Sequence, residues 1–496
     1  MSKKTLPLDD FNRALLKDVF PGNWKNPQPK EIYDLVVIGG GPGGMTAATI
    51  AAGLNLKVAL IEKEHLGGEC LNVGCIPSKA LLRSSRCAAE VRDAADFGIE
   101  VPKGWKVDFP AVMQRVRRLQ TTLSPHDSPE HFKRLGIDVF LGAARFTDAT
   151  GVEVSGQTLH FKKGIIATGT KPLLPDIAGL EEVGYLTNQT VFKLNSLPPR
   201  LAVIGGGPIS CELSQAFLRF GSRVTLITRG AHLLPKDDFT ATERLQKVFE
   251  GEGMEIFLQT QVKHVEKKGK EKILHLDTGK AVPFDEILVA IGRVPCVEGL
   301  DLEKAGVKYD LKNGIASDDT LKTNNPNIYT VGDVGSRYKF THISKELGKM
   351  AVLNALKEGK WKRSSLVVPW STYTDPEIAH VGLQEKEAQE KGIPVQTLVT
   401  EMKDIDRAIL DGETVGFVKI HMQAGTGQIL GGTIMAKHGG DMISELAVAI
   451  ASQKGITTLA EAIHPFPTQA EVIRTAAAAL VKSLANKSEH FQRKIA

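Results

Sequence analysis

The stretch that decides the fold is 34–62, which reads DLVVIGGGPGGMTAATIAAGLNLKVALIE. A short apolar run is followed by spaced glycines, an Ala-rich stretch and a second apolar run at 57–61. This order predicts a β-strand, a tight turn, a helix and a second strand parallel to the first. We therefore expect a βαβ unit and an α/β fold.

The glycines of this stretch have the spacing of a dinucleotide-binding loop. Gly39 permits a tight turn, Gly41 lets the backbone approach a pyrophosphate, and Gly44 lets the helix pack on the strand. The helix N-terminus attracts the anion, and Glu62 at the end of the second strand can accept from a ribose hydroxyl. The sequence predicts a first dinucleotide site here.

A second copy of the pattern begins at residue 200. An apolar run at 201–204 leads into Gly205 and Gly207, Ser210 stands at the third glycine position, and a strand is expected at 223–227. Arg229 follows that strand and no carboxylate does. An acid there would repel a 2′-phosphate whereas an arginine could pair with it, so this loop favours NADPH over NADH. A solvated surface arginine is the alternative.

The rest of the chain extends this plan to two Rossmann-like dinucleotide-binding domains and a C-terminal α+β domain. Further strands are expected at 165–169, 288–292, 328–333 and 416–420, with helices at 441–453 and 469–487. An amphipathic stretch at 11–20 is either a short docked helix or a loose arm. The expected divisions are an N-terminal extension (1–30), an FAD-binding domain in two parts (31–186 and 296–365), an NAD(P)-binding domain (187–295) and an interface domain (366–496).

Composition narrows the function classes. Hydrophobic residues make up 42% and charged residues 24% of the chain, close to the globular average, which argues against disorder. The 62 basic and 57 acidic residues are interspersed, which argues against nucleic acid as a partner. Asp9 and Asp10 disagree with a signal or transit peptide, and no run of 18 apolar residues occurs. We expect a cytoplasmic protein with no membrane partner.

A close cysteine pair lies in residues 67–79, GGECLNVGCIPSK. An odd total of five cysteines does not describe an extracellular disulfide framework, so Cys70 and Cys75 are more typical of a catalytic or metal-binding pair. Zinc is disfavoured because Cys87, Cys211 and Cys296 are isolated. No resident metal is expected.

The spacing of the pair sets a conformational requirement. Five residues along a helix rise about 7.5 Å, beyond the roughly 4.4–6.8 Å between Cα atoms that a disulfide tolerates. The segment must therefore depart from a helix, and Gly74 supplies that freedom. Pro77 fits a first helical turn, so Cys75 is expected near a helix N-terminus, where the thiolate is stabilised.

The segment 70–79 resembles the signature of the flavoprotein disulfide reductases, a family that includes dihydrolipoamide dehydrogenase, glutathione reductase and mercuric reductase. Both glycine loops, Thr168-Gly169 and the 331–333 segment fall in the family's order. The resemblance implies FAD on the first loop, a nicotinamide dinucleotide on the second, and a homodimer joined by the third domain, with an active site shared between subunits.

The resemblance also implies residue roles. Cys75 is the thiol next to the flavin, Cys70 is the outward thiol of a redox disulfide, and Lys79 pairs with Glu212 near the flavin; Cys211 has no family role. His464 and Glu471 complete the candidate catalytic set. The expected cofactor-binding residues are Gly39, Gly41, Gly44, Glu62, Thr168, Gly169, Gly205, Gly207, Arg229, Gly292, Asp333 and His342.

The C-terminal segment 464–471, HPFPTQAE, departs from the family pattern. The disulfide reductases carry His-Pro-Thr-x-x-Glu there, and Phe466 occupies the place of the acid–base histidine. Phenylalanine cannot titrate, so a group typically worth about 10²- to 10⁴-fold in rate is lost. On an extended segment His464 faces the same side and is a possible substitute. The alternative is a packed or capping histidine.

Mercuric reductases likewise lack this histidine, and the 373–377 segment is also closer to that branch. The expected tail cysteine pair and amino-terminal metal-binding domain of those enzymes are not found in this sequence. We predict an FAD oxidoreductase that passes electrons from NAD(P)H through the Cys70–Cys75 disulfide to a small-molecule, disulfide or metal-ion acceptor, similar to mercuric reductase. The alternatives are a dihydrolipoamide dehydrogenase or other small-disulfide reductase, and a flavin redox sensor without turnover.

Overall fold

The computed structural model describes residues 9–357 and 359–482, and these form two compact units. Of these described residues, the first unit comprises 9–205, 216–227, 261–357 and 359–366, and the second comprises 206–215, 228–260 and 367–482. The domain boundaries expected from the sequence stay a prediction. In the described part of the chain, no helix is long and apolar enough to cross a membrane.

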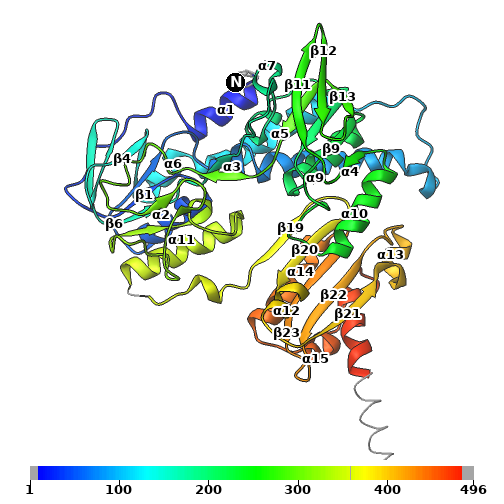
Figure 1. Cartoon of the computed structure of the whole chain (residues 1–496). Helices are drawn as coiled ribbons and strands as arrows, with labels where there is room; N and C mark the ends of the chain where they lie inside the picture. Colours follow the sequence, from blue (N-terminus) through cyan, green and yellow to red (C-terminus); the bar gives the residue numbers. More distant parts are fainter. Residues whose placement is uncertain (1–8, 358, 483–496) are drawn as a thin grey trace, which may run out of the picture. The chain divides into compact units, whose positions relative to one another are not determined.

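The first unit is built on a seven-stranded sheet that confirms the predicted βαβ unit (Figure 1). Its order is β3-β2-β1-β6-β5-β4, with β18 also pairing with β6. Strands β1, β2, β3, β6 and β18 are parallel, and β4 and β5 are antiparallel. The bounds are β1 Tyr33–Ile38, β2 Val58–Glu62, β3 Ile137–Leu141, β4 Ala144–Phe146, β5 Gly151–Val154, β6 Gln157–Ile166 and β18 Ile328–Thr330.

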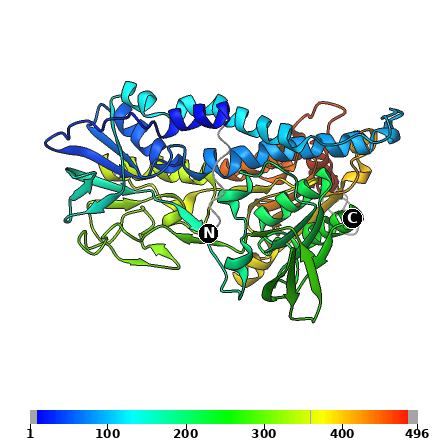
Figure 2. The same ribbon diagram turned by 90° about the horizontal axis from the view of Figure 1, so that it is seen from above.

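The strands of this sheet form because their apolar runs are covered on both faces. All five residues of β2 are buried, as a parallel strand between helices requires. Helices α2 and α11 pack against each other. Helix α4 packs along α5, and this second pair of helices is coloured in shades of blue in Figure 2. The bounds are α2 Pro42–Gly53, α3 Gly68–Asn72, α4 Cys75–Arg92, α5 Phe109–Leu123, α6 Pro129–Arg134 and α11 Thr341–Leu356.

The amphipathic stretch near the N-terminus is a docked helix, α1 (Asp10–Val19). Asp9 caps it by accepting from the backbone N–H of Asn12 at 2.8 Å. The Asp9 carboxylate also pairs with Arg117 of α5 at 2.5 Å, and Leu15 is buried. Of the two alternatives for this stretch, the docked helix is therefore correct.

A second parallel set in the same unit carries the second glycine loop. Strands β9, β8 and β14 pair in that order, with β8 Arg200–Ile204, β9 Arg223–Ile227 and β14 Glu286–Val289. An antiparallel set follows, with β11 Val262–Lys268, β12 Glu271–Leu276 and β13 Ala281–Phe284. Helix α9 (Pro208–Phe220) begins directly after the loop. The predicted strands at 201–204 and 223–227 are confirmed.

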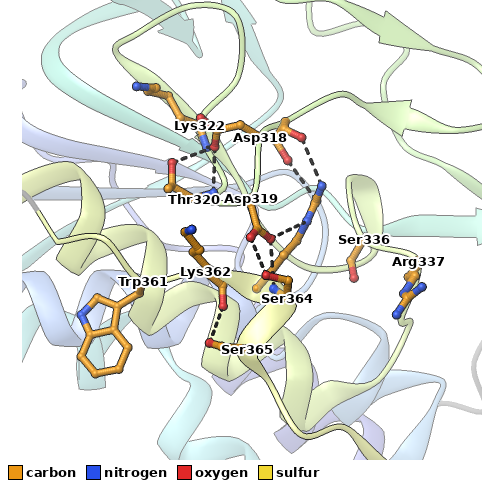
Figure 3. Close-up of polar contacts among 12 residues, drawn as sticks. Asp318, Asp319, Thr320, Lys322, Ser336, Arg337, Trp361, Lys362, Ser364 and Ser365 are labelled. Carbon is orange, nitrogen blue, oxygen red and sulfur yellow. Dashed lines mark hydrogen bonds and ion pairs between the residues drawn. The ribbon is translucent and has the colours of Figure 1, made fainter. Parts of the chain in front are cut away.

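The end of the first unit is fixed to a neighbouring loop (Figure 3). Asp319 accepts from the backbone N–H of Ser364 at 3.0 Å and from its hydroxyl at 2.5 Å. The amide of Asn354 donates to the Trp361 carbonyl at 2.9 Å. These contacts anchor residues 361–365 before the chain enters the second unit.

The second unit is centred on a five-stranded antiparallel sheet of order β19-β20-β23-β22-β21. Helix α14 packs on it and buries Leu446. The predicted strand at 416–420 and helix at 441–453 are confirmed within two residues at each start, whereas residues 483–487 of the last predicted helix lie outside the described residues. The bounds are β19 Pro369–Thr372, β20 Glu377–Gly382, β21 Val395–Glu401, β22 Phe417–Gln423, β23 Ile429–Ala436, α10 Phe239–Gly251, α14 Gly439–Ala451 and α15 Ile456–Glu461.

Candidate active site

The first glycine loop joins the carboxyl end of β1 to the start of α2. A Cβ atom at Gly39 would lie 2.3 Å from the Ala167 carbonyl oxygen, and one at Gly44 would lie 1.9 Å from the Gly39 carbonyl oxygen. Glycine is thus required at both positions by the chain's own packing. A Cβ at Gly41 would approach nothing closer than the Gly68 Cα atom at 3.9 Å. The space beside Gly41 fits the approach of a pyrophosphate to the backbone.

Glu62 lies at the end of β2, beside this loop, as the sequence predicts. Its carboxylate accepts from the backbone N–H of Gly40 and from that of Glu64, both at 2.6 Å. Burial raises the pKa of Glu62, and these two bonds oppose the rise. A carboxylate has about four acceptor positions, so lone pairs remain for a ribose hydroxyl.

The two cysteines are carried by separate short elements. Cys70 lies in α3, and α4 begins at Cys75. Between them Gly74 has φ −132° and ψ −115°, and a Cβ atom there would lie 2.7 Å from the Glu69 carbonyl oxygen. The predicted break in the helix and the predicted place of Cys75 at a helix N-terminus are both confirmed. In the described part of the chain neither cysteine is joined in a disulfide; Cys75 is exposed and Cys70 is half-buried.

Thr341, the first residue of α11, contacts the dithiol. Its Oγ1 atom lies 3.3 Å from the Sγ atom of Cys75. The hydrogen bond to Cys75, burial and the charge of Cys75 raise the pKa of Cys70, while Thr341 and the Lys345 ammonium lower it. Sequence reasoning missed Thr341 and Lys345, because nothing in their local pattern marks them.

A partly buried polar network connects Glu69, the residue before Cys70, to Asp333. The Glu69 carboxylate forms a close ion pair with Arg293. Arg293 also donates to the Thr170 hydroxyl at 2.7 Å and to the Thr170 carbonyl at 3.0 Å. The Thr170 hydroxyl in turn donates to Asp333 at 3.2 Å. Burial raises the pKa of both Glu69 and Asp333, and Arg293 opposes this. Glu69 and Arg293 are further residues that the sequence did not single out, although Glu69 adjoins Cys70.

The remaining predicted cofactor residues of the first unit lie on nearby turns. The Thr168 hydroxyl donates to the Cys296 carbonyl at 2.7 Å, and the Gly169 carbonyl accepts from the Cys296 N–H at 3.0 Å. Gly292, with φ +140°, accepts from the Leu173 N–H at 3.0 Å. His342 lies in the first turn of α11, where its ring stacks on Phe340 at 5.6 Å. Their roles toward a cofactor stay predictions.

The second glycine loop joins β8 to α9. Gly205 has φ +126°, and its N–H donates to the Ile227 carbonyl at 2.8 Å. A Cβ atom at Gly207 would meet nothing within 4 Å. This is the same open position that Gly41 provides in the first loop. Arg229 is exposed directly after β9. Cys211 is fully buried in α9, as a packing residue would be.

The predicted Lys79–Glu212 pair joins residues of the two different units, and it stays a prediction. Lys79 lies in the second turn of α4. Glu212 is 5% exposed in α9, and its carboxylate accepts from the backbone N–H of Tyr373 at 2.9 Å.

The C-terminal segment places the candidate acid–base residues in different surroundings. His464 has a side chain 9% exposed, and its Nε2 atom lies 3.1 Å from the Glu445 carboxylate of α14. Phe466 is 70% exposed. Glu471 begins the last described helical stretch, residues 471–482. The structure therefore joins His464 to Glu445, a partner that the sequence did not predict.

Comparisons with known proteins find a matching family model and similar chains over most of the sequence. The family model described as "Pyridine nucleotide-disulphide oxidoreductase" matches residues 33–359, and the model of that family's dimerisation domain matches residues 368–477. The mercuric reductase of Lysinibacillus sphaericus is 34% identical over 455 residues, 91% of this chain and 83% of that protein. The dihydrolipoyl dehydrogenase of Chlamydia muridarum is 36% identical over 451 residues, 89% of this chain and 95% of that protein.

Two solved structures are similar over most of their length. LpdA from Mycobacterium tuberculosis has a TM-score of 0.83 at 27% identity, covering 90% of this chain and 99% of that one. The Cu(II) complex of the HOCl-induced flavoprotein disulfide reductase RclA from Escherichia coli has a TM-score of 0.81 at 27% identity, covering 89% and 98%.

Proposed function

The chain belongs to the pyridine nucleotide-disulphide oxidoreductase family, and we propose that within this family it passes electrons from NADPH to a metal ion, as a mercuric-reductase-like enzyme. The family uses FAD and NAD(P)H, so the protein is an FAD-dependent oxidoreductase with a redox-active cysteine pair. Its dimerisation domain supports a homodimer. The choice of NADPH, the acceptor, the residue roles and a cytoplasmic location belong to the proposal.

The first loop fits FAD. Gly41 leaves its backbone open to a pyrophosphate, Glu62 retains acceptor positions for a ribose, and the Asp333 carboxylate, proposed to face the flavin, accepts from the Thr170 hydroxyl. Bound FAD would supply two-electron chemistry between the nicotinamide and sulfur. The chain's own contribution is to hold Cys75 at the start of α4, where the helix N-terminus favours its thiolate, and to present Cys70 to the acceptor.

The second loop fits NADPH. Gly207 leaves its backbone open to a pyrophosphate, as Gly41 does in the first loop, and the exposed Arg229 offers the cation that a 2′-phosphate needs. Thr228, the residue before it, is buried and offers no competing carboxylate.

The observation that carries the acceptor assignment is Phe466. It stands where the family's disulfide reductases have an acid–base histidine, and 70% of it is exposed on its own subunit. In the homodimer we propose that segment 464–471 of one subunit faces the dithiol of the other. An apolar side chain there cannot protonate a leaving thiolate. Reduction of a metal ion held by two thiolates releases no thiolate of a substrate, so it does not need that proton.

A second candidate function is reduction of a small disulfide such as lipoamide. The observation in its favour is the His464–Glu445 contact, because a carboxylate commonly orients a general-base histidine; in this role the Nδ1 atom exchanges its contact with the Ala462 carbonyl for one with the substrate. The similarity to relatives named dihydrolipoyl dehydrogenase also supports this candidate.

The test is turnover of the FAD-loaded protein with NADPH and a panel of acceptors: Hg(II), Cu(II), lipoamide and oxidised glutathione. We expect metal-ion reduction to exceed disulfide reduction in kcat/KM, and Cys70→Ser to abolish it. Faster turnover of lipoamide would establish the second candidate instead. If the protein oxidises no NADPH with any of these four acceptors, the result would favour a flavin redox sensor without turnover.

A further inference from the structure

The segment between the two cysteines is held by a buried glutamine of α5. We call residues 66–74 the dithiol turn, since they contain α3 and end just before α4 begins. Gln120 is 4% exposed, and its Nε2 atom donates to the carbonyl oxygens of Leu71 and Asn72, both at 2.9 Å. These carbonyls lie at the C-terminal end of α3, where a helix has no N–H groups of its own to offer them. Both N–H bonds of the amide are therefore used to fix the end of α3.

The dithiol turn is also closed on itself. The side-chain amide of Asn72 donates to the Leu66 carbonyl at 3.0 Å and to the Gly68 carbonyl at 2.8 Å. These bonds join the last residue of α3 to the start of the turn. The position that Gln120 sets at the end of α3 is therefore shared by the residues before it, including Cys70.

The N-terminal helix α1 contacts the start of the same turn. The Val19 carbonyl accepts from the backbone N–H of Leu66 at 3.1 Å, and both residues are fully buried. The Phe20 ring, at the end of α1, meets the His65 ring edge to face, with the ring centroids 6.0 Å apart. The dithiol turn is thus held at its start by α1 and at its end by α5.

Two hydroxyl contacts join α1 to α5, so that these holds belong to one support. The Thr121 hydroxyl donates to the Phe11 carbonyl at 2.9 Å, and the Ser124 hydroxyl donates to the Asp18 carboxylate at 2.6 Å. Both donors lie at or just before the end of α5, next to Gln120. Helix α1 therefore fixes the part of α5 that carries the amide.

We propose that Gln120 is a positioning residue for the redox-active cysteine pair, and that α1 braces it. By fixing the dithiol turn, the amide keeps the Cys70 sulfur within reach of that of Cys75. This raises the effective concentration of one thiol toward the other and so stabilises the disulfide. The inference concerns only the formation of the disulfide, so it does not depend on the acceptor that the proposed function assigns.

The test is the thiol–disulfide equilibrium of the FAD-loaded full chain in mixtures of reduced and oxidised dithiothreitol. In this exchange the S–S bond of oxidised dithiothreitol breaks, the Cys70–Cys75 bond forms, and the two protons of the cysteine thiols pass to the dithiothreitol thiols. Alkylation and mass spectrometry give the reduced fraction of the tryptic peptide 64–79, which contains both cysteines and no other. We expect Gln120→Met to lower the ratio of reduced to oxidised dithiothreitol at the midpoint by about tenfold, a rise of about 30 mV in reduction potential.

Three further variants separate the parts of the support. Gln120→Glu keeps the shape of the side chain and should shift the midpoint in the same direction, because a carboxyl group offers at most one donor where the amide offers two. Ser124→Ala removes the contact with Asp18 and should give a smaller shift of the same sign. Thr122→Val is the matched control, because this exposed hydroxyl donates to the Arg118 carbonyl of its own helix at 3.0 Å, and it should leave the midpoint unchanged.

Each outcome bears on a separate part of the inference. A wild-type midpoint in both Gln120 variants would overturn the role of the glutamine, and a wild-type midpoint in Ser124→Ala would overturn the bracing by α1. An equal shift in Thr122→Val would indicate a general disturbance of α5 and would also contradict the inference. The equilibrium requires neither NADPH nor an acceptor, so a failure of the proposed metal-ion reduction and a failure of this inference are distinguishable results.

Discussion

The Nε2 atom of His464 lies 3.1 Å from a carboxylate oxygen of Glu445 in α14. The Nδ1 atom of the same ring lies 3.2 Å from the Ala462 carbonyl oxygen, so both ring nitrogens are engaged within the subunit. Phe466, two residues further on, is 70% exposed. The two side chains thus meet different surroundings. This contrast places Phe466, rather than His464, on the accessible side of the segment.

Introducing a histidine at that exposed position tests the acceptor assignment. We expect Phe466→His to raise disulfide reductase activity with lipoamide while flavin reduction by NADPH stays unchanged, because only protonation of a leaving thiolate involves this position. The gain should remain below the roughly 10²- to 10⁴-fold worth of a well-placed acid, since Glu471 must orient the new ring. Stopped-flow absorbance measures the rate of flavin reduction by NADPH, and steady-state assays measure the turnover of lipoamide.

The control is His464→Ala, introduced into the wild-type protein and into the Phe466→His variant. Robust lipoamide turnover by the wild-type protein that survives this substitution would show that the proton donor lies elsewhere and would contradict the argument from Phe466.

Arg229 decides the nucleotide preference in our interpretation. We expect wild-type protein to use NADPH with a higher kcat/KM than NADH, and Arg229→Ala to lower kcat/KM for NADPH by about tenfold, equivalent to about 1.4 kcal/mol, with little effect on NADH. Flavin reduction rates against each nucleotide measure this. Equal use of both nucleotides by the wild type would contradict it.

Cys75 begins α4 and contacts Thr341, which makes it the thiol expected to be ionised beside the flavin. Two-electron reduction of the FAD-loaded protein should therefore produce a long-wavelength absorption band, and Cys75→Ser should abolish it. Cys70→Ser is the matched control and should retain a band at suitable pH. A band that persists in Cys75→Ser would refute the assignment.

Asp237 predicts a pH dependence of stability in the second unit. It is 9% exposed, burial raises its pKa to about 6, and the Trp370 indole N–H donates to it at 2.8 Å. Because the folded pKa exceeds the unfolded value of 3.8, the folded state binds the proton more tightly. This contribution to stability is present below about pH 4 and is lost as the pH rises through 6.

Asp237→Asn keeps the acceptor for Trp370 and removes the titration. We expect it to stabilise the protein at pH 7.5 by about 2 kcal/mol, with the advantage over wild type shrinking toward pH 4. Thermal unfolding followed by tryptophan fluorescence across this range is the measurement. An advantage that does not vary with pH would show that Asp237 does not carry the proton.

The sequence by itself determined the parts of this protein that short-range constraints specify. The position of Gly44 follows from a clash with the Gly39 carbonyl oxygen of the same loop. The break at Gly74 follows from the distance that a cysteine pair can span. The short continuous apolar runs and the glycine spacing therefore predicted the βαβ units and the dinucleotide loops, and Pro77 predicted the start of α4.

Tertiary structure alone decided which distant residues meet at the dithiol. Thr341 contacts Cys75 across 266 positions of sequence, and Arg293 pairs with the Glu69 carboxylate across 224. No local pattern encodes such contacts, because Thr341 begins α11 and Arg293 begins the strand Arg293–Pro295, and only the folded first unit brings these segments to α3 and α4. The same reason applies to the pKa of Asp127 and of Asp237, which burial raises. Burial is a property of the packed fold, and the local sequence around a buried aspartate does not distinguish it from a solvent-exposed one.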